Sequence, residues 1–166
     1  MILRGERVLL RPMERGDSAE LARIAAEPEV ARWWGVVSEQ ELLDKAAGAE
    51  GVVALAVETG GTLIGLIQFS EEPDPMYRHA TVDLFLSAAF HGRGLGREAV
   101  ALVVRHLIDD LGHHRVTIDP AAANERAIRC YAAAGFTTVG VMRRYERGPD
   151  GRFHDGLLME LVAERL

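Results

Sequence analysis

Three glycines at alternate positions separate a predicted strand from a predicted helix. The strand covers residues 81–86 (TVDLFL), and Gly92, Gly94 and Gly96 follow it. Glycine tolerates positive φ angles and lets the backbone approach a ligand without side-chain clashes. Because a helix begins directly afterwards, its unpaired N–H groups and positive dipole end face the same point. The segment therefore predicts a phosphate-binding loop between a strand and a helix.

The helix after this loop has a single apolar stripe. Its apolar residues recur at i, i+3, i+4 and i+7 and are Val100, Val103, Val104, Leu107, Ile108 and Leu111. Gly112 then supplies a stop signal. This pattern indicates a helix that packs one face against a sheet.

The rest of the chain alternates strand and helix signals, without repeats or low-complexity linkers. Further strands are predicted at 8–12, 52–58, 63–69, 115–119, 137–145 and 153–161, and further helices from Asp17, from Ser38 and over 125–134. This order predicts an α/β fold of the α+β type, with one mixed, mostly antiparallel twisted sheet of about six to seven strands flanked by about four helices. One domain is expected over residues 1–166.

Side-chain caps mark the expected starts of these further helices. Asp17 and Glu20 have the spacing of a capping box, and Ser38 has the same spacing to a later glutamate. Asn124 is the expected N-cap of the helix over 125–134.

Charge and composition exclude several classes of protein. The 166 residues carry a net charge of −6, which suits a cationic substrate and not a nucleic-acid surface. No apolar run approaches the roughly 20 residues of a membrane span, and residues 1–10 lack the apolar core of a signal peptide. Cys130 is the only cysteine, which excludes an internal disulfide. We expect a cytoplasmic monomer or homodimer that binds neither nucleic acid nor membrane.

The glycine loop does not match two common nucleotide-binding motifs. A P-loop would end in Gly-Lys-Ser/Thr, whereas Gly96 is followed by Arg97 and Glu98. A dinucleotide fingerprint counted from Gly92 would require a third glycine where Arg97 stands. Arg93 and Arg97 nevertheless favour an anionic ligand over a plain flexible turn.

Two segments carry a family resemblance. Residues 91–96 read HGRGLG, and residues 124–136 read NERAIRCYAAAGF. The first is similar to the pyrophosphate loop Gln/Arg-x-x-Gly-x-Gly/Ala of the GNAT superfamily of acyl-CoA-dependent N-acetyltransferases, with His91 in the first place. The second resembles the signature Asn-x-x-Ala-x-x-x-Tyr-x-x-x-Gly-Phe of the same superfamily. The resemblance implies a GNAT-like fold with acetyl-CoA as cofactor. It also implies a set of cofactor-binding residues: Leu84, Phe85, Leu86, His91, Gly92, Arg93, Gly94, Leu95, Gly96, Arg97, Asn124 and Ala127.

Finer resemblances concern the acceptor of the acetyl group. Residues 32–35 (RWWG) and 117–120 (TIDP) are similar to aminoglycoside 6'-N-acetyltransferases and related siderophore acyltransferases. The hairpin over 143–155 resembles the ribosomal-protein N-terminal acetyltransferases. Together they imply acetyl transfer to a primary amine, with an aminoglycoside-like molecule or another small polyamine as the leading acceptor. A protein N-terminal amine, a siderophore precursor and a non-catalytic acyl-CoA-binding module stay open as alternatives.

Asp83 is the only charged residue in the strand before the loop, and it matches the general base proposed for the 6'-acetyltransferases. An amine with a pKa of about 10.4 arrives as an ammonium ion, which must lose a proton before it attacks a thioester. An aspartate with an unperturbed pKa of about 3.9 is a weak base. Either burial raises the pKa of Asp83, or its carboxylate mainly binds the ammonium. A purely structural carboxylate is the third alternative.

Tyr131 matches the position where the family places the general acid for the departing thiolate. A phenol with a pKa of about 10 stays protonated at neutral pH and can donate to sulfur. Tyr131 follows Asn124 by seven residues, so both fall on one helical face. The alternative is an aromatic ring packed in the core.

The further candidates for binding the acceptor are Trp33, Trp34, Glu72, Asp119 and Asp155. An aromatic face holds a cation or a sugar ring, but adjacent tryptophans cannot share a helix face, so one of the two is expected in the core. Asp119 at a strand end either binds an ammonium or caps a turn. Glu72 either lines the acceptor site or belongs to a solvated acidic loop.

Two other kinds of site are not predicted. No His-Glu-x-x-His or paired-cysteine spacing occurs, so no metal site is expected. Cys130 lies inside a predicted helix, away from the helix N-terminus that would lower the pKa of its thiol. We expect a packed side chain there and not a nucleophile.

Overall fold

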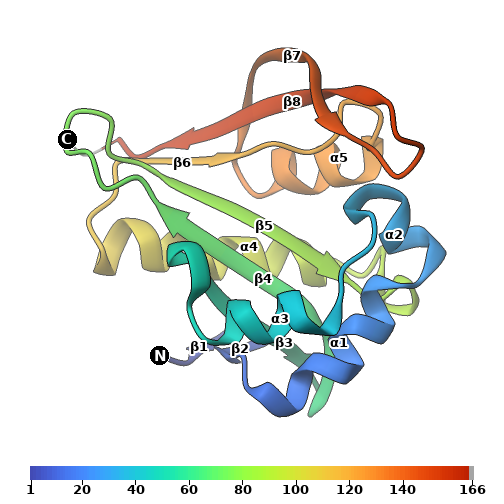
Figure 1. Ribbon diagram of the computed structural model, residues 1–166. Helices are drawn as coiled ribbons and strands as arrows, with labels where there is room; N and C mark the ends of the chain where they lie inside the picture. Colours follow the sequence, from blue (N-terminus) through green and yellow to red (C-terminus); the bar gives the residue numbers. More distant parts are fainter. Residues whose placement is uncertain (165–166) are drawn as a thin grey trace.

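The computed structural model describes residues 1–164, and its centre is one twisted sheet with helices on both faces (Figure 1). The strands within these residues are β1 (Leu3–Arg4), β2 (Leu9–Pro12), β3 (Val53–Thr59), β4 (Thr62–Glu71), β5 (Ala80–Leu86), β6 (Arg115–Ile118), β7 (Thr137–Arg147) and β8 (Phe153–Val162). Their order across the sheet is β1-β2-β3-β4-β5-β6-β8-β7. Every neighbouring pair is antiparallel except β5 with β6. The predicted fold class, a mixed and mostly antiparallel sheet, is therefore confirmed.

The α-helices of the described part of the chain are α1 (Ser18–Ala25), α2 (Pro28–Trp34), α3 (Glu39–Ala46), α4 (Leu95–Arg105) and α5 (Glu125–Ala133). The structure thus has eight strands and five helices within residues 1–164, slightly more than predicted. Strand β1 has two residues, too few for an alternating pattern to appear. Helix α2 has seven residues and begins at Pro28, so it is shorter than two full turns.

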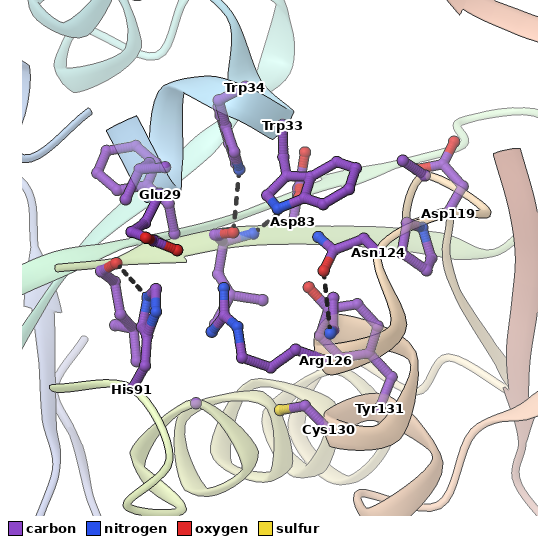
Figure 2. Close-up of a pocket in the computed structure, with 18 of the residues that line it drawn as sticks. Glu29, Trp33, Trp34, Asp83, His91, Asp119, Asn124, Arg126, Cys130 and Tyr131 are labelled. Atoms are coloured by element: carbon purple, nitrogen blue, oxygen red, sulfur yellow. Dashed lines mark hydrogen bonds between the residues drawn. The ribbon is translucent and has the colours of Figure 1, made fainter. Parts of the chain in front are cut away.

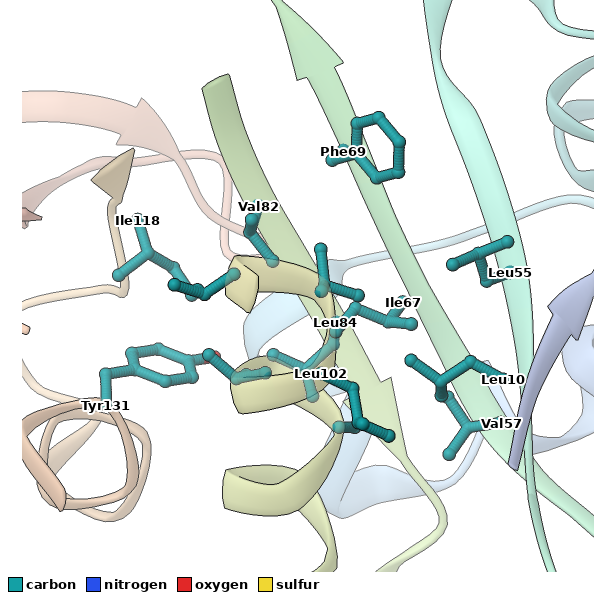
Figure 3. Close-up of a cluster of buried hydrophobic side chains, with 14 of the residues drawn as sticks. Leu10, Leu55, Val57, Ile67, Phe69, Val82, Leu84, Leu102, Ile118 and Tyr131 are labelled. Atoms are coloured by element: carbon teal, nitrogen blue, oxygen red, sulfur yellow. The ribbon is translucent and has the colours of Figure 1, made fainter. Parts of the chain in front are cut away.

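Two apolar clusters lie on opposite faces of the sheet. The larger one packs α4 and α5 against the sheet, and Figure 3 shows part of it around Ile67, Leu84 and Leu102. The smaller one packs α1, α2 and α3 against the other face and includes Phe85. Because side chains alternate along a strand, Leu84 and Leu86 face α4, whereas Asp83 shares the opposite face with Phe85.

The parallel pair in the middle of the sheet is very short. β5 pairs with β6 only at Ala80 and Thr81, where the Thr81 and Thr117 hydroxyls lie 2.9 Å apart. Beyond this point the two strands diverge, as Figure 1 shows, although β5 continues to Leu86. The separation leaves the second half of β5 without a strand partner on this side within the described residues.

Two of the three predicted caps are confirmed. The Ser38 hydroxyl accepts the Glu41 N–H at 3.1 Å, and the Asn124 side chain accepts the Ala127 N–H at 3.2 Å. The predicted capping box at Asp17 is wrong. Asp17 ends a 3₁₀ turn, Arg15–Asp17, and its carboxylate pairs with Arg11 of β2 at 2.8 Å. The same carboxylate accepts the Glu14 N–H at 2.8 Å, so it caps the 3₁₀ turn and pairs in bidentate geometry with Arg11, and makes no cap bond to the first turn of α1.

The amphipathic helix after the glycine loop is confirmed. α4 continues as a π-helical turn, His106–Asp110, and the chain turns at Gly112 with φ +73°. Val100, Val103 and Leu107 of the predicted stripe are fully buried. None of the helices described here has the length and apolar character that crossing a membrane requires.

Candidate active site

A pocket of about 590 Å³ opens where β5 and β6 diverge (Figure 2). Its walls come from β5, α2, α5, the end of β7 and the segment after β6. The residues that line this active-site pocket are Glu29, Val30, Trp33, Trp34, Asp83, Leu84, Phe85, Leu86, His91, Gly96, Asp119, Pro120, Ala121, Asn124, Arg126, Ala127, Cys130, Tyr131, Tyr145 and Glu146.

The glycine loop lies at one end of this pocket and opens α4. Gly92 and Gly94 have φ angles of +74° and +76°, which L side chains rarely adopt, and Gly94 is the N-cap of the helix. A Cβ at Gly96 would lie 3.5 Å from the Cys130 sulfur, so the loop packs closely against α5. The first turn of α4, whose N–H groups have no intrahelical acceptors, therefore follows directly from the loop at the place where the sequence predicts an anion site.

Two side chains hold the loop in place. The Arg7 guanidinium donates to the Arg93 carbonyl, with 2.6 Å between the two atoms. The His91 Nε2 atom lies 2.7 Å from the Leu86 carbonyl, and because a carbonyl only accepts, Nε2 carries the hydrogen. Burial lowers the pKa of His91, so the imidazole is neutral at physiological pH. His91 thus ties the loop to the end of β5.

Asp83 faces the pocket from the middle of β5. Its carboxylate accepts the Leu84 N–H at 2.9 Å, and no salt bridge reaches it within residues 1–164. Burial, and next the negative charge of Asp119, raise the pKa of Asp83 to about 7. A carboxyl group with that pKa is partly ionised near neutrality, and its ionised form can accept a proton as a general base.

Tyr131 faces the pocket from α5. Tyr131 is 6% exposed, and its ring packs in the larger apolar cluster near Phe136. Its hydroxyl lines the pocket and has no hydrogen-bond partner in the part of the chain that the structure describes. Burial, followed by the charge of Asp83, raises the pKa of Tyr131 well above its usual value. The phenol is therefore a protonated donor: its ring packs in the core and its hydroxyl faces the pocket, an arrangement compatible with the predicted role of general acid.

The two tryptophans of α2 have different surroundings. The Trp34 ring packs edge-on against Phe85 with centroids 5.0 Å apart, and its Nε1 donates to the Leu84 carbonyl at 3.2 Å. Trp33 lies further along the pocket, with the Arg32 guanidinium 4.6 Å from its ring centroid. Trp34 thus belongs mainly to the core, and Trp33 presents its ring to the pocket.

The far end of the pocket is acidic. The Tyr145 hydroxyl donates to Asp119 at 2.8 Å, and this bond raises the pKa of Tyr145 to about 12. Burial and the charge of Asp119 also raise the pKa of Glu146. No salt bridge neutralises Asp119 or Glu146 among the described residues. This end therefore suits a positively charged ligand.

The structure places most of the predicted site residues at one location. Trp33, Trp34, Asp83, Leu84, Phe85, Leu86, His91, Gly96, Asp119, Asn124, Ala127 and Tyr131 all line the pocket, and Gly92, Arg93, Gly94, Leu95 and Arg97 form the adjoining loop and first helical turn. Glu72 lies outside it, on the loop after β4, where it accepts the Asp74 N–H. Asp155 lies outside it too, and accepts the Arg144 N–H.

Sequence reasoning missed several residues of the pocket: Glu29, Val30, Pro120, Ala121, Arg126, Cys130, Tyr145 and Glu146. No local sequence pattern marks Tyr145 and Glu146 as pocket residues. They lie on an edge strand, and Tyr145 contacts Asp119, after β6, which is distant in the sequence. Cys130 is partly buried as expected, and burial raises the pKa of its thiol, although it also borders the pocket.

A mixed sheet that diverges beside a glycine-rich loop, with a carboxyl group and a phenol across the gap, is consistent with the acyl-CoA-dependent transferase that the sequence resemblance implies. The family model of the acetyltransferase (GNAT) domain matches residues 7–137, and the chain belongs to this family. The sequence is 29% identical to the aminoglycoside N(6')-acetyltransferase type 1 of Klebsiella pneumoniae over 163 residues, which covers 87% of this chain and 79% of that protein.

Two solved structures are similar over nearly the whole chain. The aminoglycoside acetyltransferase AAC(6')-Ib, in complex with paromomycin and acetyl-CoA, has a TM-score of 0.77 at 27% identity, covering 95% of this chain and 94% of that one. The ribosomal-protein-S5-alanine acetyltransferase of Vibrio fischeri has a TM-score of 0.84 at 19% identity, covering 99% and 98%, which shows the fold. The predicted N-acetyltransferase class and acetyl-CoA as co-substrate are confirmed.

Proposed function

We propose that the chain acetylates a primary amine of a small polycation, of the aminoglycoside or polyamine type. The observation that carries this proposal is the acceptor end of the pocket, where Asp83, Asp119 and Glu146 have no cationic partner within residues 1–164. Trp33 and Tyr145 add aromatic surface beside these carboxylates. Asp83 and Asp119 are partly buried and Glu146 is exposed, so the three carboxylates present negative charge that attracts an ammonium-bearing ligand.

The two ends of the pocket bind different substrates. Acetyl-CoA places its pyrophosphate on the N–H groups of the glycine loop and its pantetheine arm along the unpaired side of β5 near Leu86. The acceptor enters from the side of Trp33 and Glu146. The thioester carbon and the amine then meet between β5 and α5, at Asp83 and Tyr131.

The reaction removes two protons from the acceptor nitrogen and delivers one proton to the departing sulfur. Asp83 takes one proton from the acceptor ammonium, and the free amine nitrogen attacks the thioester carbon. The carbon–sulfur bond then breaks, and the Tyr131 hydroxyl donates its proton to the departing sulfur. The excess proton on the new amide nitrogen passes to the tyrosinate, which restores Tyr131, and Asp83 releases its proton to solvent. No covalent bond to the protein forms.

The test is release of free thiol from acetyl-CoA with a panel of acceptors. Aminoglycosides and linear polyamines are compared with monoamines of matched length, N-terminal peptides and hydroxylated lysines. We expect saturable turnover with the polycations, and a KM at least about tenfold higher for the monoamines, because each lost charge-assisted contact is worth about 1.5 kcal/mol or more. Turnover with peptides alone would overturn this acceptor class.

One feature favours a protein N-terminal amine as the second candidate. A second hollow of about 740 Å³ lies between α2 and the β7–β8 hairpin and shares Trp33, Ala121 and Glu146 with the active-site pocket. An extended peptide whose first amine reaches Asp83 would find room for its next residues there. The peptide arm of the same panel tests this candidate directly.

A further inference from the structure

Tyr145 reaches a residue two strands away from its own. β7 is the edge strand of the sheet, and β8 lies between it and β6. The Tyr145 hydroxyl nevertheless donates to Asp119, directly after β6, at 2.8 Å. A regular edge strand does not extend a side chain across its neighbour, so the local shape of β7 must explain this contact.

This contact is explained by a large bulge in β7. Met142 is paired with Gly156, and Glu146 with His154, so the three residues 143–145 stand opposite the single residue Asp155. Within this bulge Arg144 has a φ angle of +49°, in the left-handed region that non-glycine residues rarely adopt. Such a conformation persists only where surrounding contacts hold it.

Two residues of β8 supply those contacts. The Asp155 carboxylate accepts the Arg144 N–H at 2.9 Å, and the Asp155 carbonyl accepts the Ala122 N–H at 2.8 Å. Gly156 is buried and leaves the space that the tyrosine ring crosses, since a Cβ there would lie 2.9 Å from the Tyr145 Cδ2 atom. Asp155 thus stabilises the bulge, and the absence of a side chain at Gly156 leaves room for the Tyr145 ring between β7 and the pocket.

We propose that Asp155 and Gly156 are positioning residues that assemble the acceptor end of the pocket by carrying Tyr145 and Glu146 into it. Neither residue lines the active-site pocket itself. They act on acceptor affinity through the bulge, whereas the acetyl-CoA end, built from β5 and α4, is independent of it. The kinetic consequence rests on the acceptor class proposed above.

Steady-state kinetics test the proposal with four variants. D155A should raise the acceptor KM by about tenfold, the effect of one charge-assisted hydrogen bond, with the acetyl-CoA KM unchanged. D155N retains an acceptor oxygen and should lie between D155A and wild type. R144G alone should change little, because glycine adopts the same φ angle, and D155A/R144G should recover part of the lost affinity.

A second readout needs no acceptor. In wild type the bond to Asp119 raises the pKa of Tyr145 to about 12, so we expect its hydroxyl to stay mostly protonated at pH 11, whereas a released Tyr145 would ionise near pH 10. Tyrosine labelled with ¹³C at Cζ reports this by NMR, with Y145F to assign the resonance and circular dichroism to confirm folding at that pH. We expect ionised Tyr145 at pH 11 in D155A and in G156A.

The two readouts separate the possible failures. If the wild type turns over no polycation, the proposed acceptor class fails, and the tyrosine titration still decides the role of Asp155. If D155A leaves both the acceptor KM and the Tyr145 titration unchanged, the positioning role is refuted. A D155A variant that raises the acetyl-CoA KM equally would also overturn it, since that result indicates general loss of structure.

Discussion

The Asp83 carboxylate and the Tyr131 hydroxyl face the same pocket from opposite walls, one from β5 and the other from α5. The two groups are electrostatically linked, because the charge of Asp83 helps to raise the pKa of Tyr131. Asp83 gains a pKa suited to accepting a proton, and Tyr131 stays protonated. An acid and a base with separated pKa values are the arrangement that the proposed acetyl transfer requires.

Replacement of the proposed base should affect turnover and leave cofactor binding intact. We expect D83N to lower kcat by about 10²–10⁴-fold, the usual contribution of a positioned general base. The dissociation constant of CoA, measured by calorimetry, should stay within about twofold of wild type, because the phosphate loop is unaffected. D109N, which removes an exposed carboxylate of the π-helical turn, is the matched control. Equal kcat values in D83N and D109N would exclude Asp83 from the reaction.

The pH profile should follow the ionisation of Asp83. Because the base is the carboxylate and its pKa is about 7, kcat/KM should rise with pH through about 7 and level off above it. Below that pH the rate should fall about tenfold per unit, and D83N should lack this dependence. A profile that is flat from pH 5 to 8 in wild type would contradict the assignment of the base.

The same pKa shift makes a prediction about stability. A carboxyl whose folded-state pKa is raised stabilises the fold at low pH, and this contribution is lost as pH rises through about 7. Between pH 5 and pH 8, wild type should therefore lose about 2 kcal/mol of unfolding free energy relative to D83N. Urea denaturation of both proteins at the two pH values measures this change in unfolding free energy. Any pH-independent effect of D83N on stability cancels in the comparison. No change between the two values would show that Asp83 is well solvated.

Removal of the Tyr131 hydroxyl should separate catalysis from packing. Y131F keeps the ring in the core, and the hydroxyl has no protein partner among the described residues, so its stability should change by less than about 1 kcal/mol. Its kcat should fall by about 10-fold or more, because the leaving sulfur loses its proton donor. Y131A, in contrast, should cost about 3–5 kcal/mol of stability. A Y131F enzyme with wild-type kcat would leave the ring with a packing role alone.

A methyl group in the phosphate loop should weaken cofactor binding selectively. G94A and G51A place alanine at φ angles of +76° and +71°, so both should lose about 1–2 kcal/mol of stability. Only G94A lies at the start of α4, and it should raise the acetyl-CoA KM by about tenfold, equivalent to about 1.4 kcal/mol. The Arg7 guanidinium, 3.1 Å from the new Cβ, has to move slightly. Equal acetyl-CoA KM values in the two variants would show that this glycine does not approach the phosphates.

Local patterns were sufficient for much of the fold and for the position of the glycine loop. The stripe on α4, the hairpin of β3 and β4, and the caps at Ser38 and Asn124 each depend on residues close together in the chain, and all are present in the structure. The glycine loop belongs to the same group, because a strand, a turn and a helix N-terminus are consecutive.

The acceptor end depends on contacts that no local pattern records. Tyr145 crosses β8 to reach Asp119, and elsewhere in the fold Asp17 pairs with Arg11 on β2 instead of forming the predicted capping box. The raised pKa of Asp83 arises from burial and from the charge of Asp119, which directly follows β6. The sequence by itself determined the elements and the phosphate loop, since these follow from backbone preferences and apolar periodicity. Only the tertiary structure decided which charges face the acceptor, because burial and charge–charge interactions depend on distances between segments far apart in the chain.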